Sequence, residues 1–252
     1  MIVGIKVGSS LLTNGKDKIN KEFILELCRQ AVILLRYKLN VFIVSSGAIA
    51  SEPDNRLSKN LRAGIGQPKL LNLYQKYFDV YGIKAAQMLL TDEDLIKGRA
   101  ELSKRIMLEA FSNRIVPVIN GNDVVDDEET KALDYCADND RLFELVCLLV
   151  KADIAIIGFD QKGIIDDEGN IVRVVKNENF ARALYFAKGG NRVGHGQEGM
   201  RTKITVLNKL AQNNIKAILA PAKEKEFIIK AVKTVIKTAT NNELSFGTIF
   251  LP

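Results

Sequence analysis

Two lysines near opposite ends of the chain are the residues best suited to chemistry. Lys6 lies in the apolar run 2–7 and is followed by Gly8-Ser9-Ser10. A lysine inside a buried strand is costly unless an anion neutralises it, and glycine lets a ligand approach the backbone. Lys203 lies in the run Gly199-Met200-Arg201-Thr202-Lys203 at the expected start of a helix, where free N–H groups bind phosphate. Both segments suit a phosphate site, although an edge strand with Lys6 in solvent is an alternative.

Polar residues also follow two predicted strands. Ser45-Ser46-Gly47-Ala48 follows the apolar run 41–44, and Asn120-Gly121-Asn122-Asp123 follows the run 115–119. In an open α/β sheet, ligands bind beyond the carboxyl ends of the strands. The alternatives are an ordinary helix cap at Ser46 and a plain turn at 120–123.

The sequence Asp138-Asn139-Asp140 comes directly before the apolar helix predicted at 141–150. Its carboxylates can cap that helix, organise cations or bind the ammonium group of a substrate. The acidic stretch 120–140 around it has little periodicity, and a loop of this length in a compact domain is usually functional or mobile.

Several other site types are not favoured. The Gly-x4-Gly-Lys-Ser/Thr spacing of a P-loop is missing, and Gly64-Ile65-Gly66 lacks the third glycine of a dinucleotide fingerprint. His195 has no obvious serine or cysteine partner, so we expect a structural role for it. The three cysteines show no metal spacing, and no metal-ligating residue is predicted.

The composition indicates a folded enzyme-sized chain rather than a nucleic-acid-binding one. The chain has 252 residues, 47% of them hydrophobic, and a net charge of +6. Residues 201–252 carry nine basic and three acidic side chains, which accounts for the whole excess. No basic tract is interleaved with aromatic residues, so nucleic acid is an unlikely partner. An odd number of thiols, no leader and only short apolar runs favour the cytoplasm without membrane attachment.

Strand and helix signals alternate along most of the chain, which favours α/β architecture with a largely parallel sheet covered on both faces. Asn20 is a candidate cap for a helix at 21–37, and Thr91 with Asp94 resembles a second cap. Pro68 suits the first turn of a helix that ends near residue 81. Pro117 weakens a central position for strand 115–119. The remaining expected elements are strands at 85–90, 154–157, 217–219 and 247–250, a hairpin over 164–175, and a helix at 200–213.

Taken in order, these segments resemble the amino acid kinase family. The matching pieces include Lys6-Val7-Gly8-Ser9, Ser45-Ser46-Gly47-Ala48-Ile49, Gln87-Met88-Leu89-Leu90-Thr91, Asp138-Asn139-Asp140 and Gly199-Met200-Arg201-Thr202-Lys203. The resemblance implies a three-layer αβα sandwich formed by one domain, 1–252. Its part at about 1–150 would bind glutamate, and its part at about 151–252 would bind ATP.

The resemblance also implies the reaction and the roles of the residues. ATP would phosphorylate the γ-carboxylate of L-glutamate, the first step of proline biosynthesis, with Mg²⁺ bound mainly through the nucleotide phosphates. The expected catalytic residues are Lys6, Lys203, Asp140 and Asp138. The expected glutamate-binding residues are Ser46, Asp123 and Asn139. The expected ATP-binding residues are Lys6, Phe159, Asp160, Gln197, Glu198, Gly199, Met200, Arg201, Thr202 and Lys203.

Two positions depart from the family pattern. Phe159 stands where threonine is usual, and Gln197-Glu198 stands where a Thr-Gly or Gly-Gly pair is common, so contacts with the nucleotide base are the least certain. The resemblance further implies a homo-oligomer, a dimer or tetramer, and feedback inhibition by proline. Many relatives also carry a C-terminal PUA domain, which we do not expect within these 252 residues. The alternatives are a family member acting on acetylglutamate, aspartate, carbamate or UMP, or a binding protein that keeps the kinase scaffold.

Overall fold

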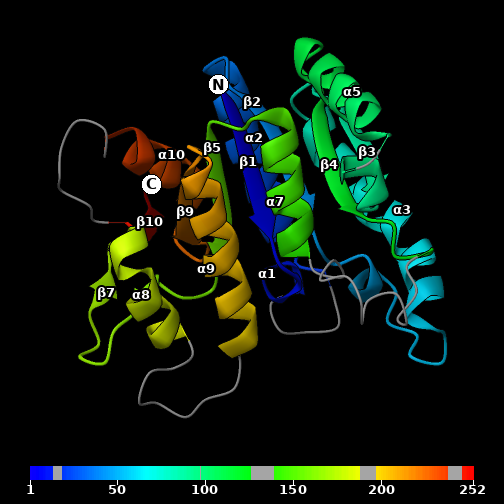
Figure 1. The fold of residues 1–252 in the computed structure, drawn as a ribbon. Coiled ribbons are helices and arrows are strands. Elements are labelled where there is room, and N and C mark those ends of the chain that lie inside the picture. The colour runs from blue at the N-terminus through cyan, green and yellow to red at the C-terminus, as the bar shows by residue number, and fades with distance from the viewer. Residues whose placement is uncertain (14–18, 97, 126–138, 188–196, 238–245) are drawn as a thin grey trace.

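The computed structural model describes residues 1–13, 19–96, 98–125, 139–187, 197–237 and 246–252. Its main sheet has eight strands in the order β3-β4-β2-β1-β5-β9-β10-β8, and helices cover both faces (Figure 1). The predicted three-layer αβα architecture is therefore confirmed. The strands are β1 (Ile2–Val7), β2 (Asn40–Ser45), β3 (Ala85–Leu90), β4 (Val116–Gly121), β5 (Ile154–Phe159), β6 (Ile164–Ile165), β7 (Ile171–Val172), β8 (Val174–Val175), β9 (Lys216–Pro221) and β10 (Thr248–Phe250).

The helices divide between the two faces, and each group encloses its own apolar core. Helices α2, α3 and α10 pack on one face with the odd-numbered residues of β1, whereas α5, α7, α8 and α9 pack on the other. The helices are α1 (Ser9–Thr13), α2 (Lys21–Arg36), α3 (Lys59–Asp79), α4 (Glu93–Ile96), α5 (Ala100–Ser112), α7 (Asn139–Val150), α8 (Phe180–Ala187), α9 (Gln197–Gln212) and α10 (Phe227–Lys237), with 3-10 turns η1 (Ile49–Ser51) and η2 (Asn177–Asn179).

The two predicted helix caps are confirmed. The Asn20 side chain accepts a hydrogen bond from the Phe23 N–H group at 3.1 Å at the start of α2. The Asp94 carboxylate accepts hydrogen bonds from both the backbone N–H and the hydroxyl of Thr91, at 2.9 and 2.8 Å. These contacts satisfy N–H groups that the first helical turn leaves without partners.

Two expectations about proline were wrong. Pro68 lies inside α3 rather than in its first turn, because the helix begins at Lys59, after Ser58, whose hydroxyl accepts from the Leu61 N–H group at 3.3 Å. Pro117 lies in β4, which is an internal strand between β3 and β2. The pairing with β2 involves only Val118 and Ile119, so Pro117 lies where β4 pairs with β3 alone.

The C-terminal third departs from simple alternation. The predicted hairpin is present but shorter, because β6 pairs antiparallel with β7 over residues 164–172 and β8 joins the main sheet instead. Strand β10 pairs antiparallel with β9 and parallel with β8. The other ladders of the main sheet are parallel, so the sheet is largely parallel as predicted.

The packing of α7 over β1 brings the start of α7 to the carboxyl ends of the parallel strands. Gly4 makes this approach possible, because a Cβ atom there would lie 2.5 Å from the Phe42 ring and 3.0 Å from the Phe143 ring. Phe143 belongs to α7, so the first turn of α7, with Asp140, comes down over the end of β1. There the parallel strands β1, β2, β4 and β5 also end, and the residues that follow them share one edge.

Candidate active site

The centre of the site is one carboxylate between two ammonium groups. The Asp140 carboxylate forms an ion pair with Lys6 Nζ through one oxygen and with Lys203 Nζ through the other, the latter at 3.0 Å. The Asp140 side chain is fully buried, and those of Lys6 and Lys203 are 3% and 15% exposed. The structure thus brings together residues 6, 140 and 203 from β1, α7 and α9. It also excludes the edge-strand alternative for Lys6, since β1 lies between β2 and β5.

The charge and the access of this centre suit an anion. The three side chains together carry one net positive charge, and buried charges attract more strongly than exposed ones because little water screens them. Glycines flank both lysines: Cβ atoms at Gly8 and Gly199 would each lie 3.7 Å from the ammonium nitrogen of Lys6 and Lys203. Glycine at these positions therefore brings the backbone of each segment close to an ammonium group.

Ser46 and Asn139 form the second part of the site, next to Asp140. The Asn139 side-chain amide donates a hydrogen bond to the Ser46 hydroxyl at 2.9 Å, which joins the end of β2 to the start of α7. The Ser46 N–H group donates to the Val7 carbonyl at 3.1 Å and so stays close to the end of β1. The predicted glutamate-binding residues Ser46 and Asn139 thus lie beside the lysine pair: Asn139 directly precedes Asp140, and Ser46 is hydrogen-bonded to Val7, which directly follows Lys6.

Asp123 lies after β4, two strands away from Lys6 along the same edge. Its side chain is half-buried, and one carboxylate oxygen lies 3.2 Å from where a Gly121 Cβ atom would be. The Asp123 carbonyl accepts a hydrogen bond from the Asn60 side chain at 2.9 Å. The structure therefore places Asp123 at the same end of the strands as the lysine pair, two strands away.

The predicted nucleotide-binding residues lie along the opposite half of the edge. Phe159 ends β5 and its carbonyl accepts from the Ala222 N–H group at 2.7 Å, while Asp160 beside it is exposed. In the first turns of α9, Met200 is buried, Thr202 is half-buried and Arg201 is exposed. Gly199 offers its carbonyl to Lys203 Nζ at 3.0 Å, which helps to aim this lysine.

Some predicted residues cannot be placed. Asp138 and His195 lie outside the described residues, as does most of the loop predicted at 120–140, and so do the side chains of Gln197 and Glu198. Cys28 and Cys147 are buried, and burial raises the pKa of both thiols, as expected for inert core residues. Among the residues that the structure describes, no group of His, Cys, Asp and Glu side chains could hold a metal ion, and no helix could cross a membrane.

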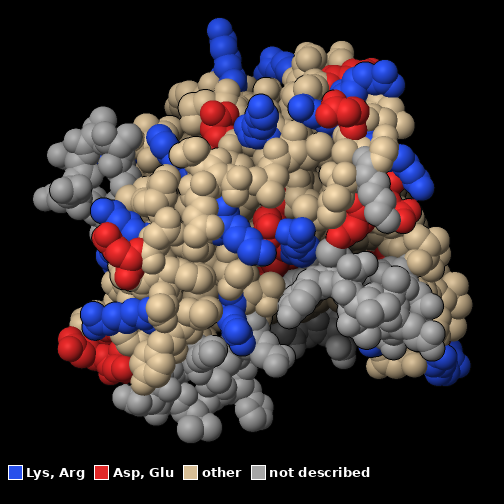
Figure 2. Space-filling model, viewed as in Figure 1, with Lys and Arg blue, Asp and Glu red and all other residues tan. Residues whose placement is uncertain are grey.

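Charged side chains of both signs lie on the surface of the protein. On the face drawn in Figure 2, basic and acidic side chains are interspersed among other residues. A shallow cavity of about 500 Å³ lies at the opposite edge of the sheet, lined in part by Met1, Lys151, Asp153 and Lys216. It contains none of the residues around Asp140, so the charge arrangement identifies the candidate site better than cavity size does.

Sequence reasoning missed the contribution of α3. The Gln67 side chain donates to the Gly121 carbonyl at 3.1 Å, and Arg62 donates to the Glu52 carbonyl at 2.8 Å. Gln67 also lines a cavity of about 10 Å³ with Ser45 and Asn120, close to the smallest volume that holds a water molecule. In the sequence, Gly64 and Gly66 inside a helical pattern are the residues that could have indicated close packing of α3 against these segments.

Comparison with known proteins gives a consistent result. Residues 1–221 match the model of the amino acid kinase family. Proteins named glutamate 5-kinase are similar to this chain: that of Shewanella oneidensis is 33% identical over 244 residues, covering 91% of this chain and 64% of the relative. The protein of that name from Caldanaerobacter subterraneus is 34% identical over 266 residues, covering 100% of this chain and 68% of the relative. The chain thus spans about two thirds of the length of these relatives.

Proposed function

The chain belongs to the amino acid kinase family, and from this premise we propose that it transfers the γ-phosphoryl group of ATP to the γ-carboxylate of L-glutamate. The observation that carries the proposal is the buried Lys6–Asp140–Lys203 arrangement. The similarity to proteins named glutamate 5-kinase supports glutamate as the acceptor. The product would be the first intermediate of proline biosynthesis.

The proposed reaction needs no general base. A carboxylate is already a nucleophile at neutral pH, so its oxygen attacks the γ-phosphorus in line, the bond to the β-phosphate oxygen breaks, and ADP leaves. Catalysis then rests on positioning and on neutralising the charge of the transferred group. Lys6 holds this group from the acceptor side and Lys203 from the nucleotide side, while Asp140 keeps both ammonium groups charged and aimed.

The acceptor amino acid would lie along the ends of β2 and β4. The Ser46 hydroxyl and the Asn139 amide, which already share a hydrogen bond of 2.9 Å, offer a donor and an acceptor to its backbone groups. Asp123 offers a carboxylate to its ammonium group. Asp138 keeps its predicted role beside Asp140.

ATP would lie along the ends of β5 and β9, with its phosphates toward the start of α9. The N–H groups and positive dipole end of this helix favour phosphate. The residues that would form this region are Phe159, Asp160, Gln197, Glu198, Gly199, Met200, Arg201 and Thr202. Mg²⁺ would be held mainly by the phosphate oxygens, as this cation usually is.

Residues of about 1–150 would thus form the glutamate half, and residues of about 151–252 the ATP half. A dimer or tetramer and inhibition by proline stay predictions.

The direct test is an acyl phosphate trap. The protein is incubated with Mg-ATP, hydroxylamine and one acceptor at a time: glutamate, N-acetylglutamate, aspartate, carbamate or UMP. We expect ADP release and hydroxamate with glutamate, and a fall in kcat on the order of 10²–10³ for Lys203→Ala. Lys233→Ala is the matched control, because Lys233 is an exposed lysine on α10. ADP release with another acceptor alone would replace glutamate, since UMP forms no hydroxamate, and no turnover with any acceptor would contradict the proposal.

A further inference from the structure

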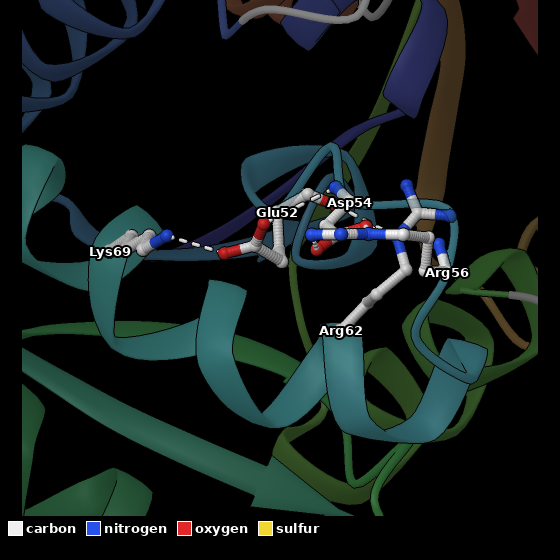
Figure 3. Close-up of polar contacts among 5 residues, drawn as sticks. All are labelled: Glu52, Asp54, Arg56, Arg62 and Lys69. Atoms are coloured by element: carbon white, nitrogen blue, oxygen red, sulfur yellow. Dashed lines mark hydrogen bonds and ion pairs between the residues drawn. The ribbon is translucent and has the colours of Figure 1, made fainter.

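The segment that follows Ser46 is held on the surface of α3 by charged side chains. The Arg62 guanidinium donates to the Glu52 carbonyl at 2.8 Å and to the Ile49 carbonyl at 3.4 Å. About two turns further along the helix, Lys69 Nζ lies 2.6 Å from the Glu52 carboxylate. Arg62 and Lys69 rise from α3 toward this segment in Figure 3. Two residues of one helix therefore hold the chain directly after the end of β2.

The same helix holds the segment that carries Asp123. Gln67 donates to the Gly121 carbonyl at 3.1 Å, and Asn60 donates to the Asp123 carbonyl itself at 2.9 Å. Val124 beside it is in contact range of α3, since a Cβ atom at Gly64 would lie 3.4 Å from its side chain. Both segments with predicted glutamate-binding residues thus rest on the N-terminal half of α3.

The helix backbone also touches the first segment directly. A Cβ atom at Gly66 would lie 1.8 Å from the Ala48 carbonyl oxygen, far inside any real contact distance. The Ser51 hydroxyl donates to the Gly47 carbonyl at 2.9 Å and closes the turn against α3. This segment is therefore positioned by backbone packing at one point and by side-chain contacts with Arg62 and Lys69 at others.

The charges of the cluster agree with a positioning role. The Glu52 side chain is 14% exposed, and its hydrogen bond with Lys69 lowers the pKa of that carboxyl group below its usual value. Arg56 and, more weakly, Arg62 lower the pKa of Asp54 in the same segment. Both carboxyl groups are therefore ionised at neutral pH; Glu52 pairs with Lys69 of α3, and Asp54 pairs with Arg56 of its own segment.

We propose that Arg62, and to a smaller extent Lys69, are positioning residues for the acceptor amino acid. They act through the Glu52 segment on Ser46, while Asn60 and Gln67 act on Asp123, so α3 sets the distance between the two ends of the acceptor site. This inference rests on the proposed function, because it assigns Ser46 and Asp123 to that site. A small displacement of such residues is enough to reduce binding of the substrate.

The expected effect is on the KM for the acceptor and not on the KM for ATP. Arg62→Ala removes two hydrogen bonds from a charged donor, so we expect the KM for glutamate to rise about 10- to 100-fold with a kcat within a few-fold of wild type. Lys69→Ala breaks a partly exposed ion pair and should raise the KM for glutamate about 2- to 5-fold. Lys69→Arg should restore the KM of wild type. Lys230→Ala is the matched control, since Lys230 pairs with Glu224 at 3.0 Å on α10, away from this edge.

Two outcomes would overturn the inference. One is an Arg62→Ala protein whose KM for glutamate is unchanged, and the other is an equal rise in the KM values for glutamate and ATP. If wild type turns over another acceptor instead, the proposed function fails while the KM for that acceptor still tests Arg62. Amide hydrogen exchange gives a reading without turnover: Arg62→Ala should speed exchange in residues 47–58, and unchanged exchange there would also refute the positioning role.

Discussion

The lysine pair predicts very different losses of stability for two substitutions that should both abolish most activity. Lys6→Met removes one of two cations and leaves Asp140 paired with Lys203. Asp140→Asn removes the carboxylate that pairs with both lysines and leaves their buried ammonium groups near each other. The two variants therefore separate the contribution of this centre to folding from its contribution to phosphoryl transfer.

The magnitudes follow from the geometry. At 3.0 Å and an effective dielectric constant of about 20, the attraction between Lys203 and Asp140 is about 5 kcal/mol before desolvation is subtracted. Removing one partner of a buried pair typically costs about 3–5 kcal/mol, which we expect for Asp140→Asn. For a chain of this length that loss lowers the melting temperature by roughly 6–20 °C. Lys6→Met should change stability by less than about 1 kcal/mol, because no buried charge is left without its partner.

The measurements are urea unfolding, thermal melting with and without Mg-ATP, and ADP release with glutamate. Both variants should lose on the order of 10²–10³ in kcat. Lys6→Met removes a contact with the transferred phosphoryl group, and Asp140→Asn removes the carboxylate that orients both lysines. Mg-ATP should raise the melting temperature of wild type more than that of Lys6→Met. The reasoning fails if Lys6→Met is as unstable as Asp140→Asn, or if either variant keeps the turnover of wild type.

Three further predictions concern other parts of the molecule. Asp123→Ala should raise the KM for glutamate about 10- to 100-fold through the loss of a charged hydrogen bond, and an unchanged KM would remove Asp123 from the acceptor site. Gly66→Ala should cost about 1–3 kcal/mol in urea unfolding, because the new Cβ atom would lie 1.8 Å from a carbonyl oxygen, whereas Gly64→Ala, with 3.4 Å of room, should be nearly neutral. Hydrogen bonds from Arg29 lower the pKa of Glu26, so Glu26→Gln should cost less than about 1 kcal/mol at pH 7. The stability difference between wild type and Glu26→Gln should fade as the pH falls below about 4.3 and through the lower pKa of the folded state. A constant difference down to about pH 3 would contradict the lowered pKa of Glu26.

The lysine centre was predictable because chemistry and local pattern pointed the same way. A lysine in an apolar strand demands an anionic partner, and acidic residues at a helix start are natural candidates for it. The family resemblance supplied the pairing of Lys6 and Lys203 with Asp140, and the structure brings these three side chains together. The hydrogen bond between Asn139 and Ser46 joins residues 93 positions apart, and nothing local in either segment predicts it.

The parts that sequence reasoning missed depend on tertiary contacts. Pro68 is a good first-turn residue, but the Ser58 cap lies one residue before Lys59, where α3 begins, so helix propensity near the proline was misleading. Strand β10 pairs antiparallel with β9, although its three residues carry no signal of direction. The sequence pattern offers Gly66 only as part of an incomplete nucleotide fingerprint, whereas in the structure glycine is needed there because α3 approaches the Ala48 carbonyl.

The use of one carboxylate for two lysines has a consequence for binding. If each lysine had its own buried carboxylate, the centre would be neutral and would gain little from an incoming phosphoryl group. With Asp140 shared, both ammonium groups are held in place, and the three side chains together carry one net positive charge. In the proposed reaction this charge would face the transferred phosphoryl group. Lys6 and Lys203 would then act mainly on turnover, whereas Asp140, which pairs with both, would act on stability as well.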